Sequence, residues 1–425
     1  MDYSYDAAVS ALTLKEGIAR CKPGLKRMIA ADYDSEFASL ALLDDYPRLD
    51  KAAGLAKHFR DTDLLIVCGI GGSNLGAMSV AQALLGSHYE AHNQPTVLWA
   101  DTVDSHHAAY IVSRLEEALL KKQHVVLNII SKSGTTTETV ALATVLIETL
   151  KSQQDWRDRV VVTTDKGSKM WSLAEQEGFH LLEIPKMVGG RYSVFSPCGI
   201  FPLAIMDIDV MELFKGAIAA RGDCLQPNDK NPALKRAITL WHEQKNGKRI
   251  HNLFLFSHQL EMLGKWYRQL LAESLGKEKN KRHRTVHAGI TPIVSVGSVD
   301  LHSMAQLYLD GPNDKVTTFV KLGKHEQMLI PVNKSLATLV SNVQGKNINQ
   351  VMEAILGGVQ AAYRQSNRPF MSITLDAPDE KSVGYFLQQM MIEVMLLGEL
   401  LQVNAFDQPA VEKYKNETRR LLAGK

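Results

Sequence analysis

Short apolar runs alternate with helical patterns along most of this chain, and this alternation restricts the possible folds more than any other feature. From about residue 60 the apolar runs predict a first series of strands. They lie at residues 64–68, 96–100, 124–130, 159–164 and 180–184. Because helical patterns separate these strands, the series predicts a parallel sheet with helices on both faces.

A second series of strands and helices begins near residue 250. Its strands are predicted at 253–256, 293–296, 316–320 and 372–375, and its helices at 260–271, 335–366 and 381–402. We therefore expect an α/β fold of two doubly wound domains, with mainly parallel sheets and helical arms at both ends. The expected divisions are 1–45 for the N-terminal arm, 46–205 and 206–402 for the two domains, and 403–425 for the C-terminal arm.

The composition narrows the setting and the partners of the chain. Its 425 residues suffice for two domains, and its formal net charge of +2 favours neither nucleic acid nor an acidic partner. The four cysteines form no C-x-x-C pair, which is typical of a reducing compartment. No apolar run reaches the length of a membrane span. Together with the charge and the cysteines, this predicts a cytoplasmic protein that binds neither a membrane nor nucleic acid.

A hydroxyl-rich segment, residues 131–139 (SKSGTTTET), lies between the predicted strand at 124–130 and a predicted helix. Its hydroxyl groups would lie beside the free backbone N–H groups of the helix N-terminus, which attract anions. The segment therefore predicts a phosphate site. The alternative is an elaborate N-cap in a Ser- and Thr-rich turn, but the number of hydroxyl groups favours phosphate.

A glycine-rich segment, residues 69–76, follows the first predicted strand in the same way. Glycine lets a ligand approach the backbone closely. The alternative is a dinucleotide site of the G-x-G-x-x-G pattern, with Asp101 as the ribose-binding acid. Because Asn74 stands where that pattern requires a glycine, we expect no nucleotide cofactor.

Two further segments carry groups suited to acid–base chemistry. Arg191 follows two glycines in a predicted loop, where a guanidinium group can clamp an anion or neutralise an oxyanion, or can form a surface ion pair. Gln269 and Glu273 are four residues apart and share one helix face. Glu273 is a candidate general base, and the alternative is a helix pair with Lys277.

His302 and the C-terminal segment complete the candidate groups. His302 lies near a predicted helix start, where it can move a proton or can have a structural role only. Gln408 precedes the predicted terminal helix and Lys415 lies within it, although a solvated helix would also explain both.

A basic run at residues 277–284 is interpreted as a solvated loop, because no aromatic residues interleave it as in nucleic-acid sites. The alternative is that it helps to hold a phosphate group. Within and beside this run, His283 and His287 have the spacing of a helical metal pair but no third ligand, so we expect no metal.

Taken in order, these motifs resemble those of the phosphoglucose isomerase family, whose domains are of the sugar isomerase (SIS) type. The resemblance covers about residues 60–415 and rests on six motifs, namely 71–76, 131–138, 190–193, Gln269 with Glu273, His302, and Gln408 with Lys415. It implies reversible conversion of glucose 6-phosphate to fructose 6-phosphate through an enediolate, in glycolysis and gluconeogenesis. It also implies a homodimer that needs neither a cofactor nor a metal.

The resemblance further implies which residues bind the phosphate group. The implied ligands are Ser131, Ser133 and Thr136, with Ser73 nearby, and the backbone N–H groups of Lys132 and Ser133. The family often has Thr in place of Ser133 and Gln in place of Thr137, and both differences leave a polar group in the loop.

For the sugar, the resemblance implies that Glu273 moves a proton between C1 and C2 while Arg191 stabilises the enediolate. The other implied site residues are His302 and Lys415 for ring opening, Glu138 to orient His302, and Gln269 and Gln408 to line the site. Two other functions are compatible with the sequence. A sugar-phosphate sensor would need the phosphate loop but not the catalytic groups, and a related isomerase would also act on mannose 6-phosphate.

Overall fold

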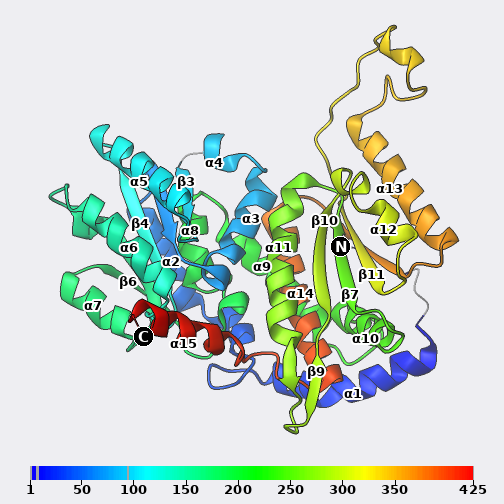
Figure 1. Cartoon of the computed structure of the whole chain (residues 1–425), viewed down its shortest axis with the longest axis horizontal. Coiled ribbons are helices and arrows are strands. Elements are labelled where there is room, and N and C mark those ends of the chain that lie inside the picture. The colour runs from blue at the N-terminus through cyan, green and yellow to red at the C-terminus, as the bar shows by residue number, and fades with distance from the viewer. Residues whose placement is uncertain (1, 6–8, 93–94, 425) are drawn as a thin grey trace.

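The computed structural model describes residues 2–5, 9–92 and 95–424. It contains two five-stranded sheets that stand side by side, each with helices on both faces (Figure 1). The predicted α/β fold with mainly parallel sheets is confirmed. The expected domain divisions stay a prediction.

The first sheet is parallel throughout and has the strand order β3-β2-β4-β5-β6. Its strands are β2 (Leu64–Cys68), β3 (Thr96–Ala100), β4 (Val125–Ser131), β5 (Val160–Asp165) and β6 (His180–Ile184), within one residue of the predicted bounds. In β2, Leu65 and Val67 join one core cluster and Ile66 joins the other, because successive side chains point to opposite faces. Both faces are covered by helices, so every position of the strand is apolar.

Two groups of helices cover the first sheet. One face is covered by α5 (Ser105–Leu120), α6 (Thr137–Leu150) and α7 (Lys169–Glu177). The other is covered by α2 (Tyr46–His58), α3 (Leu75–Leu85) and α8 (Pro197–Ile205). The short α4 (Tyr89–His92) contacts β3.

The second sheet has the order β1-β12-β11-β7-β10 and is parallel except for β1. Its strands are β1 (Asp2–Tyr5), β7 (Ile250–Leu255), β10 (Thr291–Val296), β11 (Lys315–Leu322) and β12 (Phe370–Leu375). The edge strand β1 lies in the segment that the sequence predicts as a helical arm, of which α1 (Ala11–Ile29) is helical. Four residues that pair on one side only carry too little pattern to predict a strand.

The core passes from one sheet to the other through a group of shared helices. These are α9 (Val210–Cys224), α10 (Pro232–Lys245), α11 (Glu261–Leu275) and α14 (Glu380–Leu401). Figure 1 shows α9, α11 and α14 between the two sheets. The far face of the second sheet is covered by α12 (Ala305–Leu309) and α13 (Ile348–Gln365). Because one cluster of buried side chains includes residues of both sheets, the domains pack tightly together.

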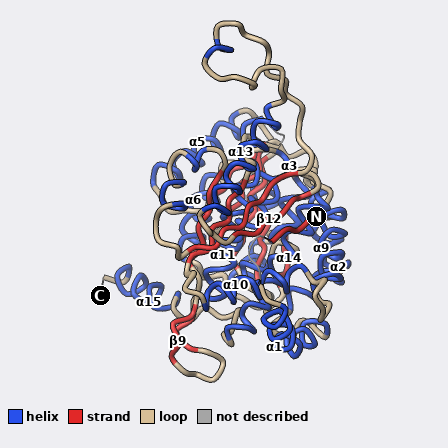
Figure 2. The backbone as a smooth tube through the Cα atoms, turned by 90° about the vertical axis from the view of Figure 1, so that its right-hand side faces the viewer, coloured by secondary structure: helices blue, strands red, loops and turns tan. Residues whose placement is uncertain are grey.

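Two predicted segments have a different structure. Only the later part of the helix predicted at 335–366 forms, as α13, and the earlier part belongs to a long projecting loop with one short turn, η7 (Leu336–Thr338) (Figures 1 and 2). The prediction of a solvated loop is correct for part of the basic run, because residues 280–284 form a turn in which 281–284 are exposed, and is wrong for its first residues. The run forms a hairpin of β8 (Lys277–Lys279) and β9 (Thr285–Ala288), in which Lys277 is buried.

The C-terminal helix α15 (Val411–Leu422) forms as predicted, but none of its residues is buried and it stands away from the body of the molecule (Figure 2). The remaining short turns are η1 (Ala38–Asp44), η2 (Gly71–Ser73), η3 (Trp156–Arg159), η4 (Gly190–Tyr192), η5 (His258–Leu260) and η6 (Val299–Leu301). Among the helices of the described residues, none has the length and apolar character required to cross a membrane.

Candidate active site

Two glycine-containing turns meet at the carboxyl edge of the first sheet. The turn η2 follows β2, and the turn η4 follows β6. A Cβ atom on Gly72 would lie 2.2 Å from the carbonyl carbon of Gly190 and 2.5 Å from the backbone nitrogen of Arg191. Only glycine permits so close an approach, so the glycine-rich loop helps to position Arg191.

The hydroxyl-rich loop follows β4 at the same edge and leads into α6. Ser131 is 1% exposed, and its Oγ lies 3.1 Å from Oγ1 of Thr136. Thr136 is the N-cap residue of α6, yet its side chain makes no capping hydrogen bond. The first N–H groups of the helix therefore stay open to an anion, which favours the phosphate interpretation over the N-cap alternative.

Lys132 connects this loop electrostatically to Arg191. Burial is the largest cause that lowers the pKa of the Lys132 ammonium group. Asp165 opposes this shift, and the positive charge of Arg191 adds to it. The positive charges of Lys132 and Arg191 repel each other. An anionic ligand near the loop is therefore favoured, because it relieves this repulsion.

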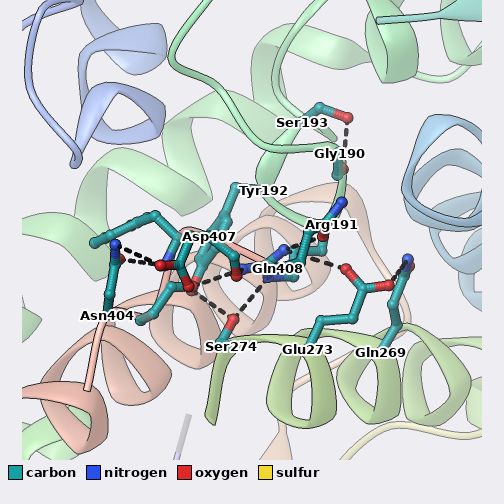
Figure 3. Close-up of polar contacts among 12 residues, drawn as sticks. Gly190, Arg191, Tyr192, Ser193, Gln269, Glu273, Ser274, Asn404, Asp407 and Gln408 are labelled. Atoms are coloured by element: carbon teal, nitrogen blue, oxygen red, sulfur yellow. Dashed lines mark hydrogen bonds and ion pairs between the residues drawn. The ribbon is translucent and has the colours of Figure 1, made fainter. Parts of the chain in front are cut away.

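Arg191 lies at the centre of the polar cluster in Figure 3 and is 2% exposed. Its Nε donates to Oγ of Ser274 at 2.8 Å. Its Nη1 donates to Oε2 of Glu273 at 3.1 Å and to Oε1 of Gln408 at 2.8 Å. One guanidinium group thus joins η4, the end of α11 and the segment before α15.

The remaining nitrogen of Arg191 contacts the same C-terminal segment. Nη2 donates to the carbonyl oxygen of Ala405 at 2.7 Å and to that of Asp407 at 3.4 Å. Because these acceptors are backbone groups, the orientation of Arg191 depends on the path of the chain at 405–408.

Glu273 and Gln269 lie on one face of α11, as their spacing predicts. Nε2 of Gln269 donates to Oε1 of Glu273 at 3.0 Å, and the Glu273 side chain is 32% exposed. Oε1 of Gln269 is buried and has no hydrogen-bond partner in the described part of the chain, so it is free to accept a sugar hydroxyl. The alternative side-chain pair with Lys277 is wrong, since Lys277 contacts the backbone carbonyl of Glu273.

Three residues of the cluster were not predicted as site residues from the sequence. The hydroxyl of Tyr192 lies 3.0 Å from Oγ of Ser274, which itself accepts from Arg191. Lys277 lies beside the cluster and contacts Asp407. Only the positions of Tyr192 and Ser274 next to Arg191 and Glu273 could have indicated these roles.

Glu273 lies at the amino edge of the second sheet, opposite to the edge used in the first. At the start of α11, a Cβ atom on Gly264 would lie 2.7 Å from the side chains of Leu255 and Val294, near the carboxyl ends of β7 and β10. At its other end, Gly276 is next to Gly289, just before β10, where a Cβ atom on Gly289 would lie 3.3 Å from it. The helix α11 therefore runs from the carboxyl edge of the second sheet to its amino edge, where it places Glu273.

Three predicted site residues lie outside the cluster. His302 is exposed and follows η6 beyond the carboxyl end of β10. Lys415 contacts Glu412 at 3.0 Å within α15, and Glu138 lies in the first turn of α6. In the residues that the structure describes, none of the three makes a polar contact with Arg191 or Glu273.

The two histidines with metal-like spacing lie in and next to β9 rather than on one helix face. The described residues contain no group of three or more side chains that could hold a metal ion.

The two mainly parallel sheets with helices on both faces define an α/β protein, and the buried Arg191 of its first half pairs with Glu273 of its second half. The family model described as Phosphoglucose isomerase matches residues 51–423, and the chain belongs to this family. The resemblance seen in the motifs is confirmed.

Two relatives agree with this assignment. The probable glucose-6-phosphate isomerase of Methanococcus maripaludis is 33% identical over 394 residues, which cover 92% of this chain and 86% of that protein. The glucose-6-phosphate isomerase of Bacillus anthracis is 32% identical over 391 residues, covering 89% and 84% of the two chains.

Two crystal structures share the fold. A hypothetical protein from Thermus thermophilus has a TM-score of 0.86 and 31% identity, and the match covers 97% of this chain and 98% of that chain. A glucose-6-phosphate isomerase from Chlamydia trachomatis has a TM-score of 0.84 at 19% identity, covering 99% and 88%.

Proposed function

We propose that this chain is a cytoplasmic enzyme that interconverts D-glucose 6-phosphate and D-fructose 6-phosphate, in glycolysis and gluconeogenesis. The observation that carries the proposal is the Arg191–Glu273 ion pair. A buried guanidinium group from η4 and a partly exposed carboxylate from α11 meet there, close to the hydroxyl-rich loop. Membership of the phosphoglucose isomerase family supports it.

The substrate phosphate group binds at the carboxyl edge of the first sheet. Its proposed ligands are the hydroxyl groups of Ser131, Ser133, Thr136 and Ser73, and the backbone N–H groups of Lys132 and Ser133. Binding one end of the substrate there holds C1 and C2 at a fixed distance from the loop. This restraint lowers the entropic part of the barrier for the reacting carbons near Glu273.

The carboxylate of Glu273 removes the proton from C2 of the open-chain aldose and returns it to C1, while the hydroxyl proton on O2 passes to O1. Negative charge develops on the enediolate oxygens. The Nη1 group of Arg191, which lies next to the carboxylate of Glu273, stabilises this charge on the enediolate. Gln269 and Gln408 orient the sugar hydroxyls. The exchange moves protons within the substrate and transfers no electrons to another molecule, so its chemistry requires no redox cofactor.

We further propose a homodimer in which His302 of the partner subunit completes each site. A helix of 15 residues such as α11 is about 22 Å long, so Glu273 and His302 of one chain lie at opposite edges of the second sheet. The projecting loop supports association, because it exposes several large apolar side chains. These are Met328, Leu329, Val332, Leu336, Leu339 and Val340.

In this dimer, His302 of the partner subunit and Lys415 open the sugar ring. Glu138, in the first turn of α6, orients the imidazole. Lys415 reaches the sugar from α15, which leaves the segment that carries Gln408.

A coupled assay tests the proposed function. Purified protein is given fructose 6-phosphate, and glucose 6-phosphate is measured by its oxidation with glucose-6-phosphate dehydrogenase and NADP. We expect turnover that inorganic phosphate inhibits competitively. Binding of fructose 6-phosphate without turnover would indicate a sensor. Equal turnover of unphosphorylated fructose to glucose, measured with glucose oxidase because the dehydrogenase requires the phosphorylated sugar, would contradict the phosphate site. Mannose 6-phosphate as a substrate decides whether the chain has the second isomerase activity.

A further inference from the structure

Lys277 is a buried cation next to the Arg191–Glu273 pair, and its side chain is 5% exposed. Its Nζ donates to the carbonyl oxygen of Glu273 at 2.7 Å and to that of Asp407 at 2.6 Å. It also lies 3.4 Å from Oδ1 of Asp407. An ammonium group has three N–H donors, so these three acceptors can use all of them.

The buried position of Lys277 is unfavourable for a cation, which indicates that the hydrogen bonds of its ammonium group have a role. Burial is the largest cause that lowers the pKa of Lys277, and the charge of Arg191 lowers it further, against the effect of Asp407. An apolar side chain of similar length would avoid the cost of burying this charge. It would leave the two carbonyl groups and the carboxylate without the ammonium donor.

The two carbonyl groups belong to the two segments that carry the proposed chemistry. The Glu273 carbonyl is in the last turn of α11, which holds the proposed base. The Asp407 carbonyl is in the segment 404–408, whose Gln408 side chain and Ala405 carbonyl hold Arg191. Lys277 therefore ties the helix of the base directly to the segment that orients the guanidinium group.

Other contacts anchor the segment elsewhere. The ring of Phe406 packs edge-on against Phe37 with centroids 5.1 Å apart, and Nδ2 of Asn404 donates to Oδ2 of Asp407 at 3.1 Å. These contacts join the segment to the N-terminal arm and close its own turn, but they do not reach α11.

We propose that Lys277 is a positioning residue for the isomerisation, which holds Arg191 and Gln408 in register with Glu273. The inference rests on the proposed function of these groups. Without the tie, the guanidinium group and the carboxylate shift relative to each other, which slows proton transfer. Substrate affinity stays, because the proposed phosphate site lies on the first sheet.

The experiment compares Lys277→Met with Lys279→Met in the full-length protein. Lys279 is the matched control because it lies on the same strand, is exposed and has no polar side-chain contact in the described residues. For Lys277→Met we expect kcat to fall at least about tenfold with KM within about twofold of wild type, as expected for lost alignment. Lys279→Met should match wild type, and Lys277→Arg should regain part of the lost kcat because it restores a donor cation.

A second readout does not depend on activity. Hydrogen–deuterium exchange of the backbone amides at 404–408 should become faster in Lys277→Met and stay unchanged in Lys279→Met. If Lys277→Met does not fold, Lys277→Gln, which keeps a donor but no charge, is judged by the same measurements.

Three results would overturn the inference. These are a kcat of Lys277→Met within about twofold of wild type, a loss explained by KM alone, or an equal loss in Lys279→Met. An inactive wild-type protein would instead reject the proposed function, and the exchange measurement would then still decide whether Lys277 ties the two segments.

Discussion

At the scale of single residues, Arg191 determines how the site is assembled. Each of its three guanidinium nitrogens donates to an acceptor, and the acceptors come from α11 and from the segment before α15. A lysine could not replace it, because one ammonium group lacks the planar fork of donors. The same guanidinium group holds the carboxylate of Glu273, which is the proposed base.

We predict that Glu273→Gln lowers kcat by about a hundredfold or more with little change in KM, because the amide keeps the shape but cannot accept the proton. Steady-state kinetics of the coupled assay measure this. The control is Glu278→Gln, a change of the same kind at an exposed position of β8. A variant at 273 with near-normal kcat would exclude Glu273 as the base.

The sequence predicts the residues of this cluster better than it predicts their contacts. Arg191 and Glu273 stand out because of local patterns, namely two preceding glycines and a four-residue spacing, whereas only the family resemblance indicates Gln408. Their partners Ser274 and Ala405 do not stand out, since the contacts join positions 83 and 214 residues apart from Arg191. Only the packing of α11 and the C-terminal segment around η4 brings them together.

At the scale of elements, the loop between β4 and α6 combines a buried hydroxyl group with the open N-terminus of a helix. In the proposed site, contacts between this loop and the phosphate group persist from the bound substrate to the transition state. They therefore contribute to KM rather than to kcat.

We predict that Ser131→Ala combined with Thr136→Ala raises KM by about tenfold or more, since each hydrogen bond to a charged group contributes roughly 1.5–3 kcal/mol. The kcat value should change little. Thr144→Ala, an exposed position later in α6, is the control. A pure loss of kcat with unchanged KM would place the phosphate group elsewhere.

The sequence predicts elements with a buried face more accurately than most exposed elements, although the exposed helix α15 also forms as predicted. The central strands follow their apolar runs because burial selects those residues. The hairpin β8–β9 has a charged, irregular sequence that shows no alternation. In the projecting loop, Leu336, Leu339 and Val340 have the spacing of a helix face, yet all three are exposed and nothing in the described chain buries them.

At the scale of the whole molecule, a buried polar network joins α10, α11 and α14 to the second sheet. Arg236 of α10 pairs with Glu393 of α14, and both are fully buried. The hydroxyl of Tyr267 donates to Glu393 at 2.7 Å, and His251 lies 2.9 Å from Oγ1 of Thr318 and 3.2 Å from the Tyr267 hydroxyl. Burial first, and the charge of Arg236 second, lower the pKa of His251 well below its usual range.

We predict that this histidine makes the protein sensitive to acid. Because the folded pKa is lowered, the stabilising effect is present above the unfolded pKa of about 6.5 and is lost as the pH falls below it. Between pH 7.5 and 5.5, the wild type should lose about 1.4 kcal/mol more unfolding free energy than His251→Asn, which cannot take up the proton. Urea unfolding at the two pH values measures the difference, and equal losses would contradict it.

The proposed dimer involves the whole molecule, because each of its sites combines Glu273 of one chain with His302 of the partner subunit. Glu273→Ala and His302→Ala proteins should each be almost inactive when alone. Denatured and refolded together, they should form mixed dimers in about half of the pairs, each with one site that has lost both groups and one intact site.

The measurement is the recovered isomerase activity of this mixture, with the fraction of mixed dimers determined by two affinity tags. Shared sites predict about one quarter of the wild-type activity, because half of the sites in half of the dimers are intact. If mixed dimers form and the activity stays at the level of the single variants, each chain uses its own His302 and the shared site is wrong.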